Sequence, residues 1–399
     1  MSDKPRPRPA QSVGFALLIV FIALNLRPFL AAPGPILPAI AGDTGLGHGA
    51  LSLLTLLPML VMGLGAFAVP HLHRRLGARR GVLLGLAVLC LGSALRSFAG
   101  HGHLLILTAV LCGAGVAVVQ SIVPGLIKER FAENVAGMTG LYSAMIMTGG
   151  ALGAQSVPLL VERGLPWTTA LALLAVPVFV VGLVAAKMLP QGRRAPHKPG
   201  LVAGLVRHPR AWALMAVFGL INGGYASMIA WLAPYYQAQG WSGPDSGLLI
   251  AVMAVCQGVG SVVIPLLARK TVDRRRWLWT CIVLQGAGFA GLAAAPLLFP
   301  VLWVALCGIG LAGSFALCLI VALDHLPDPV SAGTLAALMQ GGGFILAATP
   351  PFLLAVIEAR SGSFAGGWVM HLVWLGLAAL IVAKFDPKSY GVVMASGKG

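Results

Sequence analysis

Twelve long runs of apolar residues constrain this chain more than any other feature of its sequence. A helix needs about 20 predominantly apolar residues to cross the hydrocarbon core of a bilayer. The runs do not alternate between apolar and polar residues, so they predict spanning helices rather than barrel strands. The predicted spans are 12–41, 49–70, 81–99, 103–127, 134–161, 166–188, 210–239, 246–268, 277–296, 299–323, 331–357 and 366–384.

The composition excludes an ordinary soluble domain. Of the 399 residues, 58% are apolar and 10% are charged, whereas soluble domains carry about 25% charged residues. We therefore expect an all-α polytopic membrane protein that has the lipid bilayer as a partner. The first run could be read as a cleaved signal peptide, but Arg27 interrupts it and the apolar sequence resumes as far as Ile40, which favours a retained span.

The basic residues predict how the chain lies in the membrane. One set of loops and ends carries 23 of the 27 Lys and Arg residues, the opposite set carries 3, and Arg27 is the remaining one. Loops rich in Lys and Arg face the cytoplasm, so we expect an inner-membrane protein with both termini cytoplasmic. No stripe of alternating basic and aromatic residues is present, so we expect no nucleic-acid partner.

An internal repeat divides the chain into two halves. The loop at 70–80, after the second span, has the same spacing of proline and basic residues as the loop at 265–275, after the eighth span. The offset is 195 residues, and six spans in each half make the repeat parallel. We predict an N-terminal six-helix half at 1–189, a cytoplasmic linker at 190–209 and a C-terminal six-helix half at 210–399.

Arg27 is the one charged residue that the sequence places deep inside a span. An arginine at the centre of a membrane helix costs about 2.5–3.5 kcal/mol on insertion scales. No carboxylate is predicted inside a span to pair with it, so we interpret a small anionic substrate as its counter-ion. The alternative is an arginine satisfied by backbone carbonyls that are freed around Pro28, Pro33 and Pro35.

The 195-residue offset adds candidates from the second half. It places Asn222 in the seventh span opposite Arg27 in the first span. The glycine pair that follows Asn222 predicts a weak point in that helix. Tyr225 lies three residues after Asn222 and shares its face. We expect both side chains to contact the substrate.

Gln120 in the fourth span and Gln340 in the eleventh are further candidates. Each could donate a hydrogen bond to an anion, and each could instead join two helices. No arrangement of Ser, His and Asp, no metal cluster and no phosphate loop is predicted in a cavity. We therefore expect no enzyme, no catalytic residue, no metal site and no cofactor.

Four segments of the sequence resemble the cyanate and nitroimidazole branch of the major facilitators. They are Leu24-Asn25-Leu26-Arg27-Pro28, the stretch 218–232, Ala322-Leu323-Asp324-His325 and Met339-Gln340-Gly341. The resemblance implies the major-facilitator fold and a secondary transporter that works by alternating access. It also implies cyanate, a small monovalent anion, as the substrate, with export of neutral compounds such as nitroimidazoles as the alternative. We expect a monomer.

Overall fold

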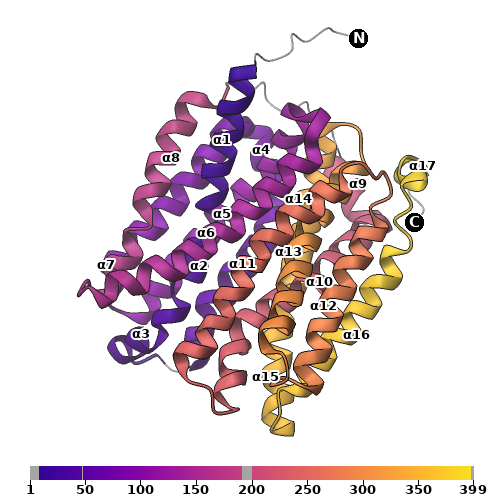
Figure 1. Cartoon of the computed structure of the whole chain (residues 1–399). Helices are drawn as coiled ribbons and strands as arrows, with labels where there is room; N and C mark the ends of the chain where they lie inside the picture. Colours follow the sequence, from indigo (N-terminus) through magenta and orange to yellow (C-terminus); the bar gives the residue numbers. More distant parts are fainter. Residues whose placement is uncertain (1–8, 47, 191–199, 397–399) are drawn as a thin grey trace.

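The computed structural model describes residues 9–46, 48–190 and 200–396, and every regular element of this part is a helix (Figure 1). The α-helices are α1 (Pro9–Leu24), α2 (Pro28–Ala31), α3 (Leu37–Thr44), α4 (His48–Ala94), α5 (Gly102–Arg130), α6 (Val135–Glu162), α7 (Trp167–Ala172), α8 (Ala175–Met188), α9 (Leu201–Arg207), α10 (Pro209–Gln237), α11 (Gly243–Ala268), α12 (Arg275–Ala294), α13 (Pro300–Asp324), α14 (Pro329–Ala347), α15 (Thr349–Ser361), α16 (Ala365–Val382) and α17 (Tyr390–Ser396). Short 3-10 turns are η1 (Gly34–Ile36), η2 (Leu95–Phe98), η3 (Ala132–Asn134) and η4 (Pro387–Ser389).

The twelve predicted spans are confirmed. Eleven helical stretches of the described chain are long and apolar enough to cross a membrane, and the shorter apolar stretch Leu53–Gly65 corresponds to the second predicted span. The second and third spans both belong to α4, which turns at Gly77, where φ is 77° and ψ is 171°. Glycine suits that turn because other residues rarely adopt a positive φ. Spans one, six and eleven consist of shorter helices. Prolines lie at the breaks in spans one and eleven, and Pro177 is the third residue of α8 after the break in span six.

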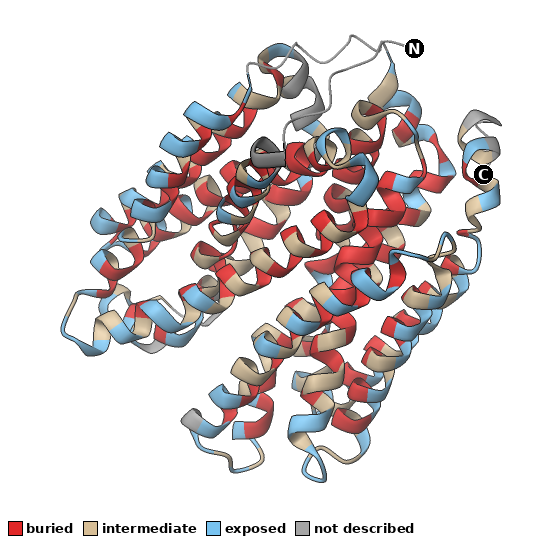
Figure 2. Ribbon diagram, turned by 45° about the horizontal axis from the view of Figure 1, so that its top comes forward, coloured by how far each residue is buried: buried red, intermediate tan, exposed pale blue. Residues whose placement is uncertain are grey.

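Burial follows the pattern of a membrane bundle. The buried residues lie where helices face one another, and the exposed residues lie on the outward sides (Figure 2). Large apolar side chains such as Leu64, Phe98 and Val255 are exposed, as expected for a chain that has lipid contacts. Helix α13 is the most deeply enclosed span, with 83% of its most apolar stretch buried.

The repeat is visible in the packing of the two halves. A Cβ added at Gly113 of α5 would lie 2.8 Å from the Cα of Pro58 in α4. A Cβ added at Gly308 of α13 would lie 2.8 Å from the carbonyl oxygen of Met253 in α11. Both the glycines and their partners are 195 residues apart. The same pair of helices is therefore brought close by glycine in each half.

The contacts between the halves include a tight crossing at one end of the bundle. We call the end with the loops at 70–80 and 265–275 the basic end, and the opposite end the far end. A Cβ added at Gly333 of α14 would lie 2.9 Å from the Cα of Gly125 in α5. Lys128 of α5 donates to the backbone carbonyls of Leu323 and Leu326, at the end of α13. The halves are thus held together at the basic end.

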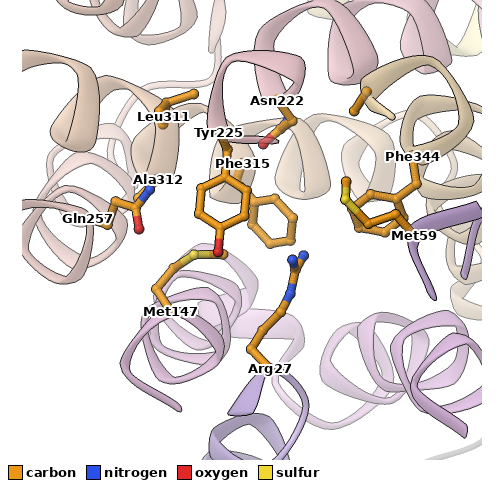
Figure 3. A pocket seen from close by; sticks show the side chains of 11 residues that line it. Arg27, Met59, Met147, Asn222, Tyr225, Gln257, Leu311, Ala312, Phe315 and Phe344 are labelled. Carbon is orange, nitrogen blue, oxygen red and sulfur yellow. The ribbon is translucent and has the colours of Figure 1, made fainter. Parts of the chain in front are cut away.

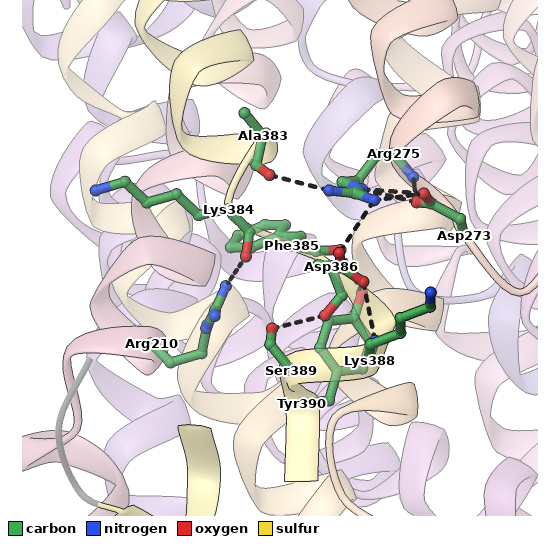
Figure 4. A network of polar contacts seen from close by, with 10 residues as sticks. All are labelled: Arg210, Asp273, Arg275, Ala383, Lys384, Phe385, Asp386, Lys388, Ser389 and Tyr390. Atoms are coloured by element: carbon green, nitrogen blue, oxygen red, sulfur yellow. Dashed lines mark hydrogen bonds and ion pairs between the residues drawn. The ribbon is translucent and has the colours of Figure 1, made fainter. Parts of the chain in front are cut away.

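The C-terminal segment is tied to the same end (Figure 4). Arg210 of α10 donates to the carbonyl of Lys384 at 2.6 Å. Arg275 of α12 contacts Asp273 at 2.7 Å and Asp386 at 3.5 Å. The hydrogen bonds from Arg275 lower the pKa of the Asp273 carboxyl. Residues 191–199 of the predicted linker lie outside the described part of the chain, so the boundaries of the halves stay a prediction.

Candidate functional site

The first span is interrupted next to Arg27. Helix α1 ends at Leu24 and α2 begins at Pro28, which has no N–H to donate to the Leu24 carbonyl. Arg27 is the N-cap of α2, with φ of −122° and ψ of −17°. A Cβ at Gly149 of α6 would collide with the Leu24 carbonyl, so glycine there lets the break pack tightly against α6. The backbone that carries Arg27 is therefore held in a fixed place.

The Arg27 side chain is buried without a full set of partners. Its exposed fraction is 3%, and its Nε and Nη1 atoms have no hydrogen-bond partner among the described residues. The alternative in which freed carbonyls satisfy the guanidinium is wrong for these two atoms. The guanidinium carbon lies 5.8 Å from the ring centre of Tyr225 and 5.6 Å from that of Phe344. The faces of these rings attract the guanidinium through cation–π contacts. They do not replace the hydrogen bonds that an anion would accept from Nε and Nη1.

A cavity opens in front of Arg27 between the two halves (Figure 3). It contains about 370 Å³ of space between atoms, including the part continuous with solvent. The lining is mostly apolar, with few polar groups, which is typical of small-molecule sites. The residues that line it are Arg27, Met59 and Met147 from the first half, and Asn222, Tyr225, Gln257, Leu311, Ala312, Phe315, Phe344 and Ala347 from the second half.

Asn222 and Tyr225 line this cavity together with Arg27, and their polar groups point into the same space (Figure 3). Asn222 Nδ2 donates to the Phe218 carbonyl at 2.8 Å, which occupies one of its two N–H groups. The expected weak point after Asn222 is wrong, because α10 runs unbroken from Pro209 to Gln237. The two glycines serve close packing instead: a Cβ at Gly223 would lie 2.7 Å from the Pro350 side chain.

Gln120 and Gln340 are not among the residues that line the cavity. Gln340 Nε2 lies 3.4 Å from the Gln120 carbonyl oxygen, and this contact joins α14 to α5 across the two halves. Both side-chain polar atoms of Gln120 are buried without a partner among the described residues. Contact of these glutamines with substrate stays a prediction.

Arg96 is a second buried arginine. The sequence counts it with the basic residues of the far-end loops, although the predicted span 81–99 includes it, and it lies near the end of that span rather than deep inside it. In the structure its exposed fraction is 0%, and it lies in η2. Arg96 Nη1 donates to the carbonyl of Phe29 in α2 at 3.1 Å, while its Nε and Nη2 atoms have no partner among the described residues.

The sequence carries little signal for Gln257 and none for the apolar wall. Gln257 is the one amide side chain in the predicted span 246–268, and that is the signal that could find it. Phe315 and Phe344 carry no such signal, because a phenylalanine that lines a cavity and one that faces lipid read alike. Among the described residues, no group of three or more His, Cys, Asp or Glu side chains is placed to hold a metal ion.

The family is decided by a match over most of the chain. The model of the Major Facilitator Superfamily matches residues 13–351. The chain belongs to this superfamily. The fold agrees: the structure of the proton:xylose symporter XylE superimposes with a TM-score of 0.77 over 94% of this chain and 96% of that one, at 14% sequence identity.

Two relatives match over nearly their full length. The chain is 40% identical over 372 residues to the cyanate transport protein CynX of Escherichia coli (strain K12), which covers 93% of this chain and 97% of the relative. It is 29% identical over 374 residues to the 2-nitroimidazole transporter of the same organism, covering 92% and 93%. The chain is thus a multi-pass membrane protein of a transporter family, and its relatives are transporters rather than enzymes.

Proposed function

We propose that this chain is a secondary transporter that carries cyanate across the inner membrane by alternating access. The observation that carries the proposal is the buried Arg27 side chain, which faces a cavity between the halves with Nε and Nη1 unpaired among the described residues. A charge in such a place is costly unless a partner arrives. An anionic substrate supplies that partner.

The chemistry of the cavity supports a small monovalent anion. Among the residues that line it, Arg27 is the one with a full charge, so one negative charge leaves the loaded site neutral. The planar guanidinium holds its N–H donors in fixed directions, and Nε and Nη1 have no partner among the described residues. The relative that is a cyanate transport protein supports cyanate in particular.

The described conformation would receive substrate from the far side, because the halves are held together at the basic end by Gly125, Gly333 and Lys128. In this proposal the basic end and both termini face the cytoplasm. The halves at 1–189 and 210–399 move about Arg27 and Asn222, and the chain acts as a monomer.

A second candidate is an exporter of small neutral compounds such as nitroimidazoles. The apolar wall of the cavity and the relative that is a 2-nitroimidazole transporter favour it. A neutral substrate, however, leaves Arg27 without a counter-ion throughout the cycle. We therefore place anion transport first.

The burial of Arg27 also predicts how transport is driven. Closing the empty carrier removes water from an unpaired charge, whereas closing the loaded carrier does not. Exchange of anions should therefore be faster than net flux, and net uptake should rely on consumption of cyanate inside. Entry of an anion against a negative potential costs about 2.3 kcal/mol per 100 mV. Comparing exchange with net uptake at clamped potential in proteoliposomes checks this, and equal rates would contradict it.

The deciding experiment is counterflow in proteoliposomes. Vesicles loaded with unlabelled cyanate should accumulate labelled cyanate from outside, and vesicles loaded with a neutral nitroimidazole should not. Arg163 is an exposed arginine next to the end of α6, so Arg163→Ala should keep the counterflow of the unchanged protein. Absence of cyanate counterflow in folded protein would overturn the proposal, and counterflow of the nitroimidazole would establish the alternative.

A further inference from the structure

The Phe29 carbonyl cannot be satisfied by its own helix. In an α-helix a carbonyl accepts from the N–H four residues later. For Phe29 that residue is Pro33, which has no N–H. The neighbouring carbonyls are served within the segment: Leu30 N donates to Arg27 O at 3.0 Å and Ala32 N donates to Pro28 O at 2.9 Å. Pro33 thus leaves this acceptor open, two residues after Arg27.

Arg96 fills this gap from another helix. Its Nη1 donates to the Phe29 carbonyl at 3.1 Å, and the whole side chain is buried. Neither Arg96 nor Phe29 lines the cavity in front of Arg27. The other two guanidinium nitrogens have no partner in the described part of the chain. A fully buried charge with one bond is a costly way to stabilise a short turn, so a structural need alone accounts for it poorly.

We infer that Arg96 is a positioning residue for Arg27, because it supplies the donor that Pro33 cannot supply and so fixes the short helix α2, whose N-cap is Arg27. Helix α2 has only four residues and packs against α6, where a Cβ at Gly153 would lie 2.6 Å from the Cα of Pro28. Without Arg96 this segment would turn to bring the Phe29 carbonyl to water or to another donor. Arg27 would turn with it. The inference rests on the proposed role of Arg27 in anion binding.

The first test is a variant cycle measured by cyanate counterflow. Arg96→Met should raise the KM for cyanate on the order of tenfold with a smaller change in kcat, because a buried acceptor loses its donor. Arg96→Lys, which keeps a cationic donor, should recover most of the loss. Pro33→Ala provides a backbone N–H for Phe29, so the double variant Arg96→Met/Pro33→Ala should return to the KM of Pro33→Ala alone.

The double variant also guards against misfolding, since it restores the missing bond by another route. A folded double variant whose KM stays raised would overturn the inference. So would an unchanged KM in Arg96→Met. Arg163→Met is the matched control, because it removes an exposed arginine.

The second test does not depend on the substrate. Arg27→Cys places a thiol at the cavity, and its rate of reaction with a small methanethiosulfonate reports where the side chain lies. Adding Arg96→Met should change this rate several-fold, and adding Pro33→Ala should restore it. If cyanate is not transported but these rates change as expected, the proposed substrate fails while the inference about Arg96 stands. Rates that do not respond to Arg96→Met would overturn the inference.

Discussion

Replacing Arg27 by methionine separates the cost of burying a charge from the benefit of binding an anion. Methionine keeps much of the length of the side chain and fits among Tyr225, Phe344 and the other apolar neighbours. The empty protein should become more stable, because the variant removes a buried charge whose Nε and Nη1 atoms have no partner among the described residues. Cyanate binding should be lost.

The magnitudes follow from the two free donors. A hydrogen bond to a charged group contributes about 1.5–3 kcal/mol, so two such bonds contribute about 3–6 kcal/mol. Their loss should lower cyanate affinity about 10²- to 10⁴-fold. The empty protein should gain about 1–3 kcal/mol in its free energy of unfolding. Arg27→Lys should lose about ten- to a hundredfold in affinity, because a point charge replaces the planar guanidinium and its fixed donors.

The assay is thermal unfolding of the purified protein with and without cyanate, followed by counterflow in proteoliposomes. For the wild type, cyanate should raise the unfolding temperature. For Arg27→Met the temperature should start higher and should not respond to cyanate. Arg163→Met serves as the control and should keep the wild-type response. An Arg27→Met protein that binds cyanate normally, or that is destabilised like a truncated core residue, would refute the reasoning.

Variants of Asn222, Lys128 and His325 test other parts of the structure. Asn222→Ala should raise the KM for cyanate about tenfold, less than the loss of Arg27, and Asn222→Asp should be worse because a like charge faces the anion; the reverse order would contradict an anionic substrate. Lys128→Met removes the hydrogen bonds to the end of α13. A reporter cysteine at Gly125 should then react several-fold faster with an impermeant thiol reagent. An unchanged rate would argue that Lys128 does not hold the halves together at the basic end. Burial lowers the pKa of His325 to about 4 from 6.5, so the folded state favours the neutral imidazole. Its contribution to stability should be present above pH 6.5 and should decline as the pH falls to about 4. In pH-dependent thermal unfolding, His325→Asn should therefore lose less stability than the wild type over this range.

The spans and the repeat could be predicted because their signals are strong and local. A run of about 20 apolar residues has few other fates, and the loops at 70–80 and 265–275 share an unusual spacing. The offset between those loops led from Arg27 to Asn222. Both residues line the cavity, because a parallel repeat places equivalent positions across the central axis.

Other features depend on packing that no local pattern reports. Arg96 is counted with the far-end loops, since hydropathy does not show that its side chain is buried against the Phe29 carbonyl. The glycine pair at 223–224 reads as a weak point, but it is occupied by neighbouring side chains. The phenylalanines of the cavity wall cannot be told from lipid-facing ones by residue type. In each case the missing information is which helix face meets another.

Arg27 and Arg96, both buried, show how one residue type serves opposite purposes in one bundle. Arg96 donates a hydrogen bond to the Phe29 carbonyl, which Pro33 leaves without a donor. The partner of Arg96 is therefore part of the fold. Arg27 lies only two residues from that carbonyl, at the break next to Pro28, yet its Nε and Nη1 have no partner in the described chain. The prolines thus create both the acceptor that holds the segment and the interruption that turns Arg27 toward the cavity. An anion site requires an unpaired donor on a backbone that its neighbours hold in place. Binding then costs little free energy for ordering the site.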